Sequence, residues 1–415
     1  MPVSNGHTPA VPSPELPSRT VTLVLTDGNG EVLGALTPFD VPSPWWPEAA
    51  PVVRAARERH GIEPIILRLL EAPARWPGGA VTYLAEVDPA ELPADLPLAA
   101  WQTELGDHPL RLPWARPGGP TADMAWAERT LAAKGIPLAG RPEQVRTWNL
   151  SSLWRLPTAT EGAWFKSVPP FFEHEGSMLE LLRGGRVPRL IAHEGRRMLL
   201  HEITGEDLHE PSRLQLLRMV EQLVELQAAW PGRIDQLLWL GLPDWRAPAL
   251  AVAIRDVIAR EAGPLSRAEN GLLDVFAARL EERLARVAEC GLPDTLVHGD
   301  FHPGNHRGSG TDIVLLDWGD SGVGQPLLDQ PAFLERVPTE RVRAVRSHWL
   351  ALWRSALPGS DPERAAVLLA PVAAARQAVI YRKFLDNIEP SEQPYHRNDP
   401  ADWLRRTAVL LADED

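Results

Sequence analysis

The stretch from Thr295 to Asp320, TLVHGDFHPGNHRGSGTDIVLLDWGD, constrains the fold of this chain more than any other. It contains two short apolar runs of the kind found in strands, and each run ends in polar residues. Asp300 and Asn305 follow the first run, and Asp317 follows the second. The segment between the runs is rich in glycine and polar residues, which favours a turn. A hairpin there would bring all three side chains to one side of the fold.

Three oxygen-bearing side chains in this arrangement suit phosphoryl transfer. That reaction needs a carboxylate that orients the attacking hydroxyl and accepts its proton, and oxygen ligands that hold magnesium against the phosphates. Asp300 suits the first task. Asn305 and Asp317 suffice for the second, because magnesium keeps several waters and takes one or two protein carboxylates. The alternative is that these are ordinary turn residues at strand ends, where Asp, Asn and Gly are common.

The motifs HGDFHPGN and LLDWGD resemble the catalytic loop and the metal-binding segment of the aminoglycoside phosphotransferase family. That family is a branch of the protein-kinase-like fold that also includes choline kinases. The resemblance implies that Asp300 is the catalytic base, that Asn305 is a metal ligand and that Asp317 is the principal metal ligand. It gives His298 only a scaffold role. Residue identity, spacing and flanking strands all agree, which disfavours the ordinary-turn interpretation.

Lysine is scarce in this chain, because only Lys134, Lys166 and Lys383 contribute to the 42 basic residues. Lys166 lies in a strand predicted at Ala163–Val168, where the family has the lysine that contacts the α- and β-phosphates. A compact ammonium on a long stem suits that role. The alternative is an edge-strand lysine that points to solvent. Glu175 lies on the apolar face of the next predicted helix, and the resemblance implies that it pairs with Lys166.

Two further predictions complete the nucleotide site, and both come from the resemblance. Leu200–Gly205 looks like the hinge between two lobes, where adenine would bond to backbone groups around Glu202 and Ile203. No glycine-rich GxGxxG loop precedes the strand lysine. The resemblance assigns Ser151 and Ser152 to the phosphate loop, although they do not lie in such a glycine-rich motif.

The N-terminal part of the chain is predicted to form a separate domain. Residues 1–19 are rich in proline and poor in apolar side chains, which predicts a disordered tail. Residues 20–112 follow the order strand, strand, helix, strand, strand, and resemble a small Nudix-like α+β domain. Of the glutamates of a Nudix box only Glu58 remains, and flanking arginines make it a poor divalent site. We predict a non-catalytic domain, and a Nudix-type pyrophosphohydrolase is the disfavoured alternative.

The rest of the chain is predicted to form a bilobal, protein-kinase-like α+β fold. A proline- and glycine-rich linker at 113–120 precedes a β-rich N-lobe at 121–205 and a helical C-lobe at 206–415. A strand is expected at Trp148–Leu156. Helices are expected at Pro47–His60, Thr121–Lys134 with Thr121 as N-cap, Pro211–Trp230, Leu273–Val287, Thr339–Leu357, Pro362–Asn387 and Asp399–Ala412.

The C-terminal part of the chain offers candidates for the acceptor pocket. Gly322–Asp329 is predicted to be a loop in which Asp329 anchors the lobe. In the related kinases, C-terminal helices and acidic residues line the pocket. A solvated acidic face is favoured over a pocket role for every candidate except the first. The candidates are Asp320, Glu389, Glu392, His396 and Asp399.

Composition narrows the partners and the location. A formal charge of −13 argues against nucleic acid or an anionic membrane as the main partner, and it favours a cationic substrate. Cys290 is the only cysteine, so an internal disulfide is impossible. No apolar run approaches the roughly 20 residues that span a bilayer. The first residues lack the basic and then apolar pattern of a signal peptide. We therefore predict a cytoplasmic location.

Together these features predict an ATP- and Mg²⁺-dependent small-molecule kinase. Its acceptor would be an aminoglycoside-like molecule, an amino alcohol or a sugar, and macrolides remain open. The alternative is a catalytically silent nucleotide-binding regulatory protein of the same fold, which is disfavoured because Asp300, Asn305 and Asp317 are all intact. The sequence leaves open the choice between ATP and GTP, the acceptor, the role of the N-terminal domain and the oligomeric state.

Overall fold

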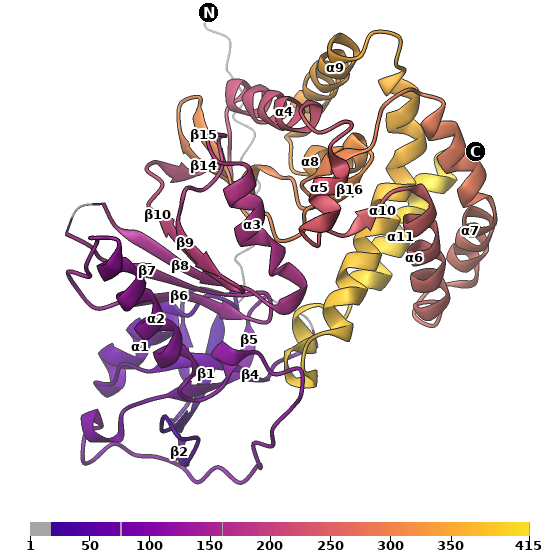
Figure 1. The fold of residues 1–415 in the computed structure, drawn as a ribbon. Coiled ribbons are helices and arrows are strands. Elements are labelled where there is room, and N and C mark those ends of the chain that lie inside the picture. The colour runs from indigo at the N-terminus through magenta and orange to yellow at the C-terminus, as the bar shows by residue number, and fades with distance from the viewer. Residues whose placement is uncertain (1–17, 75–76, 160, 415) are drawn as a thin grey trace, which may run out of the picture.

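The computed structural model describes residues 18–74, 77–159 and 161–414. Two β-sheets occupy one end of the molecule, and a helical lobe occupies the other (Figure 1). The fold is α+β with a β-rich lobe and a helical lobe, as predicted. The predicted tail lies outside the described residues, except for its last two positions.

The N-terminal domain is built on a mixed sheet. The strand order is β2-β1-β5-β4, and β3 also pairs with β1. β1 (Arg19–Thr26) is antiparallel to β2 (Val32–Ala35) and parallel to β5 (Gly79–Glu86), which is in turn antiparallel to β4 (Ile65–Glu71). β3 (Phe39–Val41) was not predicted, because three residues are too few to show an alternating pattern.

Helix α1 (Ala50–His60) packs against this sheet through Val52, Ala55 and Ala56. It ends at Gly61, whose φ of +68° is the left-handed conformation that glycine adopts at a helix end. The predicted start at Pro47 is wrong. The helix begins at Ala50, with a proline in its first turn, where the missing N–H has no helical partner to lose.

The second sheet is antiparallel throughout, in the order β6-β7-β8-β10-β9. The strand predicted at Trp148–Leu156 is wrong at its start. The chain turns at Asn149 and Leu150, so that Trp148 ends one strand and pairs with Ser151 in the next. The strands are β6 (Glu143–Trp148), β7 (Ser151–Leu156), β8 (Ala163–Ser167), β9 (Leu190–Glu194) and β10 (Arg197–His201).

Helix α2 (Gly119–Ala133) covers one face of the second sheet, where Trp126 packs against Phe165. Thr121 is not its N-cap, because the helix begins earlier, after Gly118, whose φ is +76°. The expected linker therefore contains the helix start, and Trp114 within it is buried. This stretch is part of the packed structure.

Helix α3 (His174–Leu181) packs on the other face of the second sheet. Its Met178 joins the main hydrophobic cluster together with Met198 of β10. Glu175, Met178 and Leu179 are all buried, as their helical spacing predicts. α3 thus presents Glu175 to the same side of the sheet as Lys166.

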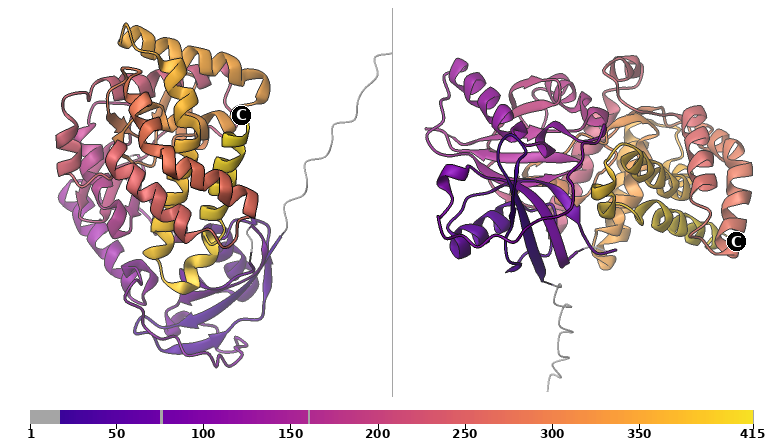
Figure 2. Two further views of the ribbon diagram at one scale, coloured as in Figure 1. Left: turned by 90° about the vertical axis from the view of Figure 1, so that its right-hand side faces the viewer. Right: turned by 90° about the horizontal axis from the view of Figure 1, so that it is seen from below.

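The C-lobe is almost wholly helical (Figure 2). Every helix expected after the hinge is present. Three short or intermediate helices, α5, α6 and α8, were not predicted. α4 has a capping box formed by Ser212 and Gln215. The helices are α4 (Arg213–Ala228), α5 (Ile234–Trp239), α6 (Ala247–Arg260), α7 (Arg267–Ala288), α8 (Gln330–Glu335), α9 (Thr339–Ala356), α10 (Pro362–Asp386) and α11 (Asp399–Ala412).

α10 is the central helix of the C-lobe and packs against α6, α7 and α11. In Figure 2 it runs through the lobe towards the N-terminal sheet. It is the one described helix that is long and apolar enough to cross a membrane, but 72% of its apolar window is buried inside the fold. A buried helix of this kind is the core of the lobe.

Two small sheets frame the segment from Thr295 to Asp320. β13 (Thr295–Val297) pairs with β16 (Gly322–Gly324), and β14 (His306–Ser309) pairs with β15 (Asp312–Leu315). The hairpin predicted between Asn305 and Asp317 is present as β14 and β15, whereas the two apolar runs lie in different sheets. The loop predicted at Gly322–Asp329 is wrong in part, because it contains β16 and a 3-10 turn.

The segment between α10 and α11 corrects a further expectation. Glu389, Glu392 and His396 are buried, not solvated, and they contact the N-terminal part of the chain, not an acceptor pocket. The Glu392 carboxylate accepts from the Leu69 amide at 2.8 Å. Asp399 is partly buried and lies 3.3 Å from His396.

Candidate active site

β13 is followed by His298 and then by Gly299, a position that only glycine fits. Gly299 has φ +91°, and a Cβ at this position would lie 2.0 Å from the carbonyl oxygen of Asp320. This close approach directs the next residue, Asp300, out of the buried strand. The Asp300 side chain is 44% exposed.

Asn305 and His302 hold Asp300. Asn305 Nδ2 donates to the carbonyl oxygen of Asp300 at 2.8 Å and to its carboxylate at 2.9 Å. His302 Nε2 lies 3.5 Å from the same carboxylate. Burial acts to raise the pKa of Asp300, but these groups and the nearby His298 lower it to about 2. Asp300 is therefore an ionised carboxylate that accepts hydrogen bonds.

The β14–β15 hairpin brings Asp317 to the same place. The Leu316 amide donates to the Asn305 carbonyl at 2.8 Å, and His298 Nε2 donates to the Leu316 carbonyl at 2.9 Å. His298 thus braces the two segments, as predicted for a scaffold residue. Asp317 is the only described non-glycine residue with positive φ, at +59°. Such strain is characteristic of functional positions.

Lys166 joins the two lobes at this cluster. Its ammonium lies 2.7 Å from Glu175 and 2.9 Å from Asp317. Burial acts to lower the pKa of Lys166, but the two carboxylates raise it above its usual range. Burial raises the pKa of Glu175, and the Lys166 charge opposes this. The structure therefore brings Lys166, Glu175, Asp317, Asn305 and Asp300 into one connected group.

A sequence model of the phosphotransferase enzyme family, APH, matches residues 159–379. This chain belongs to that family. It is a small-molecule phosphotransferase with a hydroxyl group as its acceptor. The match does not reach the N-terminal domain, so the Nudix-like resemblance stays a prediction. No curated protein matches the chain.

Several solved structures are similar to this phosphotransferase at low identity. A macrolide 2'-phosphotransferase from Brachybacterium faecium has 16% identity and a TM-score of 0.49, covering 67% of this chain and 97% of that one. The GDP complex of aminoglycoside 2'-phosphotransferase-IIIa has 15% identity and a TM-score of 0.48, covering 70% and 97%. A choline/ethanolamine kinase family protein from Mesorhizobium loti has 16% identity and a TM-score of 0.48, covering 70% and 95%.

The two serines assigned to the phosphate loop occupy the start of β7. The Ser151 hydroxyl accepts from Trp148 Nε1 at 3.1 Å, and the Ser152 hydroxyl accepts from Trp154 Nε1 at 3.0 Å. Ser152 is buried, so its side chain is turned into the phosphotransferase fold. The turn before them is held by the C-lobe, because Asn149 Nδ2 donates to the Glu392 carbonyl at 3.2 Å.

At the hinge of the phosphotransferase, two of the backbone groups expected to face adenine are already paired. The Glu202 amide donates to the Gly162 carbonyl at 3.2 Å. The Ile203 carbonyl accepts from Arg307 Nε at 2.8 Å. Within the described residues, the Glu202 carbonyl and the Ile203 amide form no backbone hydrogen bond. Arg307 was not predicted, because its contact depends on the pairing of β14 with β11 (Glu206–Asp207).

Asp320 follows Asp317 by three residues, and Arg376 and Lys383 of α10 are cations whose charges act on it. Burial and then the charges of Asp300 and Asp317 raise the pKa of Asp320 well above its usual range, against the two cations. Arg376 was missed by sequence reasoning. The signal was an arginine inside the apolar run VAAARQAV, where a buried cation needs an explanation.

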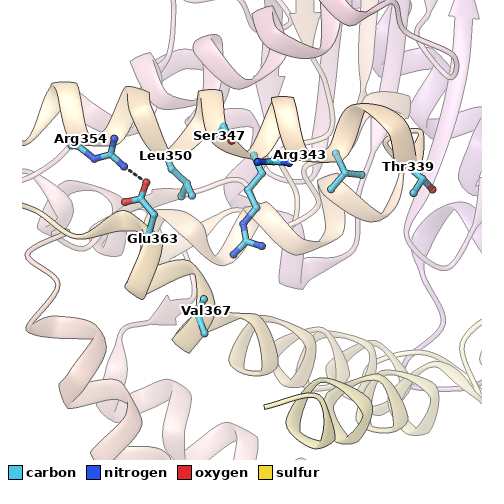
Figure 3. A pocket seen from close by; sticks show the side chains of 9 residues that line it. Thr339, Arg343, Ser347, Leu350, Arg354, Glu363 and Val367 are labelled. Carbon is cyan, nitrogen blue, oxygen red and sulfur yellow. Dashed lines mark hydrogen bonds and ion pairs between the residues drawn. The ribbon is translucent and has the colours of Figure 1, made fainter. Parts of the chain in front are cut away.

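A surface cavity of about 730 Å³ lies between α9 and the start of α10, away from the catalytic cluster (Figure 3). Arg343, Arg346 and Arg354 line it, and Arg354 pairs with Glu363. None of the predicted site residues contributes to it. Among the described residues, no group of three or more His, Cys, Asp or Glu side chains is arranged to hold a metal ion.

Proposed function

We propose that this phosphotransferase moves the γ-phosphate of ATP, bound with Mg²⁺, to a hydroxyl of an aminoglycoside-like molecule, an amino alcohol or a sugar. One observation supports this above all: Lys166 and Glu175 of the N-lobe meet Asp317 of the C-lobe, next to the bonded pair Asp300 and Asn305. A phosphate-binding cation, a metal-binding carboxylate and a proton acceptor therefore share one site.

The donor set fits magnesium. The Asn305 amide uses its nitrogen to hold Asp300, which leaves Oδ1 as the atom available to a cation. The Asp317 side chain is 50% exposed and supplies carboxylate oxygen. Magnesium takes few protein oxygens and keeps waters and substrate phosphates. When bound, the ion neutralises charge on the phosphates.

Lys166 would bind the phosphates, with Glu175 holding its ammonium in place. The ammonium has three donors, and two carboxylates occupy part of that capacity. A phosphate oxygen would take the remaining donor. The Glu202 carbonyl and the Ile203 amide would contact the base.

Asp300 would orient the acceptor hydroxyl and accept its proton. The carboxylate is ionised and half exposed, so a hydroxyl can reach it. Positioning and electrostatics supply most of the rate in phosphoryl transfer, so a weakly basic carboxylate suffices. The acidic chain supports a cationic acceptor as one candidate class.

The N-terminal domain at 20–112 is proposed to be non-catalytic, and the kinase lobes are proposed to divide near residue 205. Glu58 is exposed on α1 and lies between Arg57 and Arg59, which disfavours a divalent cation there. The single, buried Cys290 supports a cytoplasmic location.

The test is incubation with MgATP or MgGTP and a pool of aminoglycosides, amino alcohols, sugars and macrolides, followed by mass spectrometry. Asp300→Asn is the control variant. We expect a product heavier by one phosphoryl group, formed at a rate about 10²–10⁴-fold lower by the variant. Nucleotide binding with no product from any acceptor would favour the silent regulatory protein instead.

A further inference from the structure

The three peptide groups directly before Asp300 are held by side chains from outside the loop. Asp329 accepts hydrogen bonds from the amides of His298 and Gly299, both at 2.9 Å. On the other side, Arg376 Nη2 and Gln377 Nε2 of α10 both donate to the carbonyl of Gly299, each at 3.0 Å. This carbonyl belongs to the peptide unit that connects Gly299 to Asp300.

The geometry of Gly299 makes this peptide unit sensitive to rotation. Its backbone is in the left-handed region and packs directly against the backbone of Asp320. A rotation of the Gly299–Asp300 peptide would swing the Asp300 side chain relative to Asn305, its hydrogen-bond partner. The direction of Asp300 therefore depends on what holds the Gly299 carbonyl.

Arg376 is a poor choice for stability alone. It is 0% exposed, and burial lowers the pKa of its guanidinium although the charges of Asp329, Asp320 and Asp300 oppose this. Its Nε and Nη1 atoms have no hydrogen-bond partner among the residues that the structure describes. Burying a charge with unfilled hydrogen-bonding capacity is costly. The nearby carboxylates offset this cost only in part, and they do not explain why the guanidinium donates to the Gly299 carbonyl.

We propose that Arg376 and Gln377 are positioning residues that set the direction of Asp300 through the Gly299 carbonyl. The proposal rests on the proposed function, in which Asp300 orients the acceptor hydroxyl. Phosphoryl transfer depends mainly on positioning. A misplacement of about 1 Å can lower a rate about 100-fold. The two residues act on Asp300 from α10 without touching the reacting atoms.

Two donors on one acceptor predict a specific form of coupling. When Gln377 is lost, Arg376 still holds the carbonyl, so the effect is small. When Arg376 is lost, only the neutral amide of Gln377 remains, which binds the carbonyl more weakly than a guanidinium, so the effect is larger. When both are lost, nothing on α10 holds it. The rate of the double variant should therefore fall below the product of the two single effects, as residues that share a partner are non-additive.

The experiment compares Arg376→Met, Gln377→Met, the double variant and Arg376→Lys with wild type. Arg364→Met is the matched control, because Arg364 lies on the same helix but is exposed and pairs with Glu289. Turnover is measured with MgATP and the acceptor found in the pool, and as ADP release into water. Hydrogen exchange of residues 296–306, nucleotide affinity and melting temperature are measured alongside.

We expect Arg376→Met to lower kcat about 100-fold with an unchanged KM for MgATP. Gln377→Met should lower it less than about 10-fold, as one hydrogen bond would. Arg376→Lys should recover part of the loss, and exchange of 296–306 should rise most in the double variant. A general structural defect would instead lower nucleotide affinity and melting temperature together.

The outcomes separate this proposal from the proposed function. If Asp300→Asn keeps full activity, the proposed function fails. If Asp300→Asn is inactive but the double variant keeps wild-type kcat, only the positioning role fails. If wild type shows no turnover, hydrogen exchange decides: unchanged protection of 296–306 in the double variant overturns the proposal.

Discussion

Two regions of the molecule bury glutamates beside cations, and they treat these charges differently. Glu175, near the catalytic loop, is 3% exposed, and its Oε2 has no hydrogen-bond partner in the described part of the chain. Glu389, between α10 and α11, is 6% exposed, and both of its oxygens accept from Arg111. Glu175 thus has one oxygen that accepts no hydrogen bond from the described residues, whereas both oxygens of Glu389 accept one. We call Glu389 and Arg111 the saturated pair.

This difference teaches how to separate functional from structural charges. In a saturated buried pair, bidentate hydrogen bonds offset the free-energy cost of removing the two charges from water. Such a pair can therefore join two parts of a fold. A buried group with open capacity costs stability and is retained for another reason. Burial and charge alone do not distinguish the two regions. The number of carboxylate oxygens that accept a hydrogen bond distinguishes them.

The largest effect is expected at the saturated pair. Glu389→Gln removes the charge that faces Arg111 and Arg68, leaving Arg111 with only its pair to the exposed Asp107. Breaking a buried pair costs about 3–5 kcal/mol. We expect a lower denaturation midpoint with unchanged kcat in the remaining folded protein. Denaturant unfolding measures the midpoint. Glu363→Gln, which breaks an exposed pair with Arg354, is the control. If Glu389→Gln and Glu363→Gln have equal denaturation midpoints, the charge of Glu389 does not stabilise the fold.

The opposite pattern is expected at Glu175→Gln. Lys166 would keep Asp317 as a partner but lose the charge that holds its ammonium towards the phosphates. We expect kcat to fall about 100-fold, in the range of a lost electrostatic contact at the reacting group. The melting temperature should stay level or rise, because a costly buried carboxylate is gone. Steady-state kinetics and thermal unfolding give both values.

Glu180→Gln is the matched control for this prediction. Glu180 lies on the same helix, is exposed and pairs with Arg183. Its substitution should change neither kcat nor the melting temperature. A large loss of stability in Glu175→Gln with normal turnover would place Glu175 in the same class as Glu389.

The same contrast explains which features the sequence could predict. Asp300, Asn305 and Asp317 lie within one short segment, so strand period and turn chemistry are enough to bring them together. Lys166 and Glu175 are also near neighbours in the chain, and their spacing fits a strand followed by a helix. These local relations agree with the resemblance to the phosphotransferase family, from which the roles of Lys166 and Glu175 were predicted.

The segment between α10 and α11 could not be predicted in this way. Its contacts join residues far apart in the sequence, such as Leu69 and Glu392 at a separation of 323. Acidic and proline-rich residues near a chain end are typical of a solvated surface, and only the tertiary structure reveals the buried partner. Arg376 was missed for the same reason, because its acceptor, Gly299, lies 77 residues away.

The last prediction concerns how stability depends on pH through Glu392, which lies in the same buried segment as Glu389. Burial, opposed by the hydrogen bond from the Leu69 amide and helped by the charge of Glu389, raises the pKa of Glu392 to about 8 from an ordinary value of 4.5. The folded protein then holds a proton that the unfolded chain has released. The contribution of Glu392 to stability is full below about pH 4.5 and is lost as the pH rises through about 8.

Glu392→Gln should remove this dependence, because an amide does not ionise and its oxygen can still accept from the Leu69 amide. We expect similar melting temperatures for variant and wild type at pH 5, and a higher melting temperature for the variant at pH 8. Glu335→Gln, which loses only an exposed pair with Arg406, is the control and should follow wild type at both pH values. If Glu392→Gln is less stable at both pH values, Glu392 is ionised in the folded protein and belongs with Glu389 as a counter-charge for Arg68.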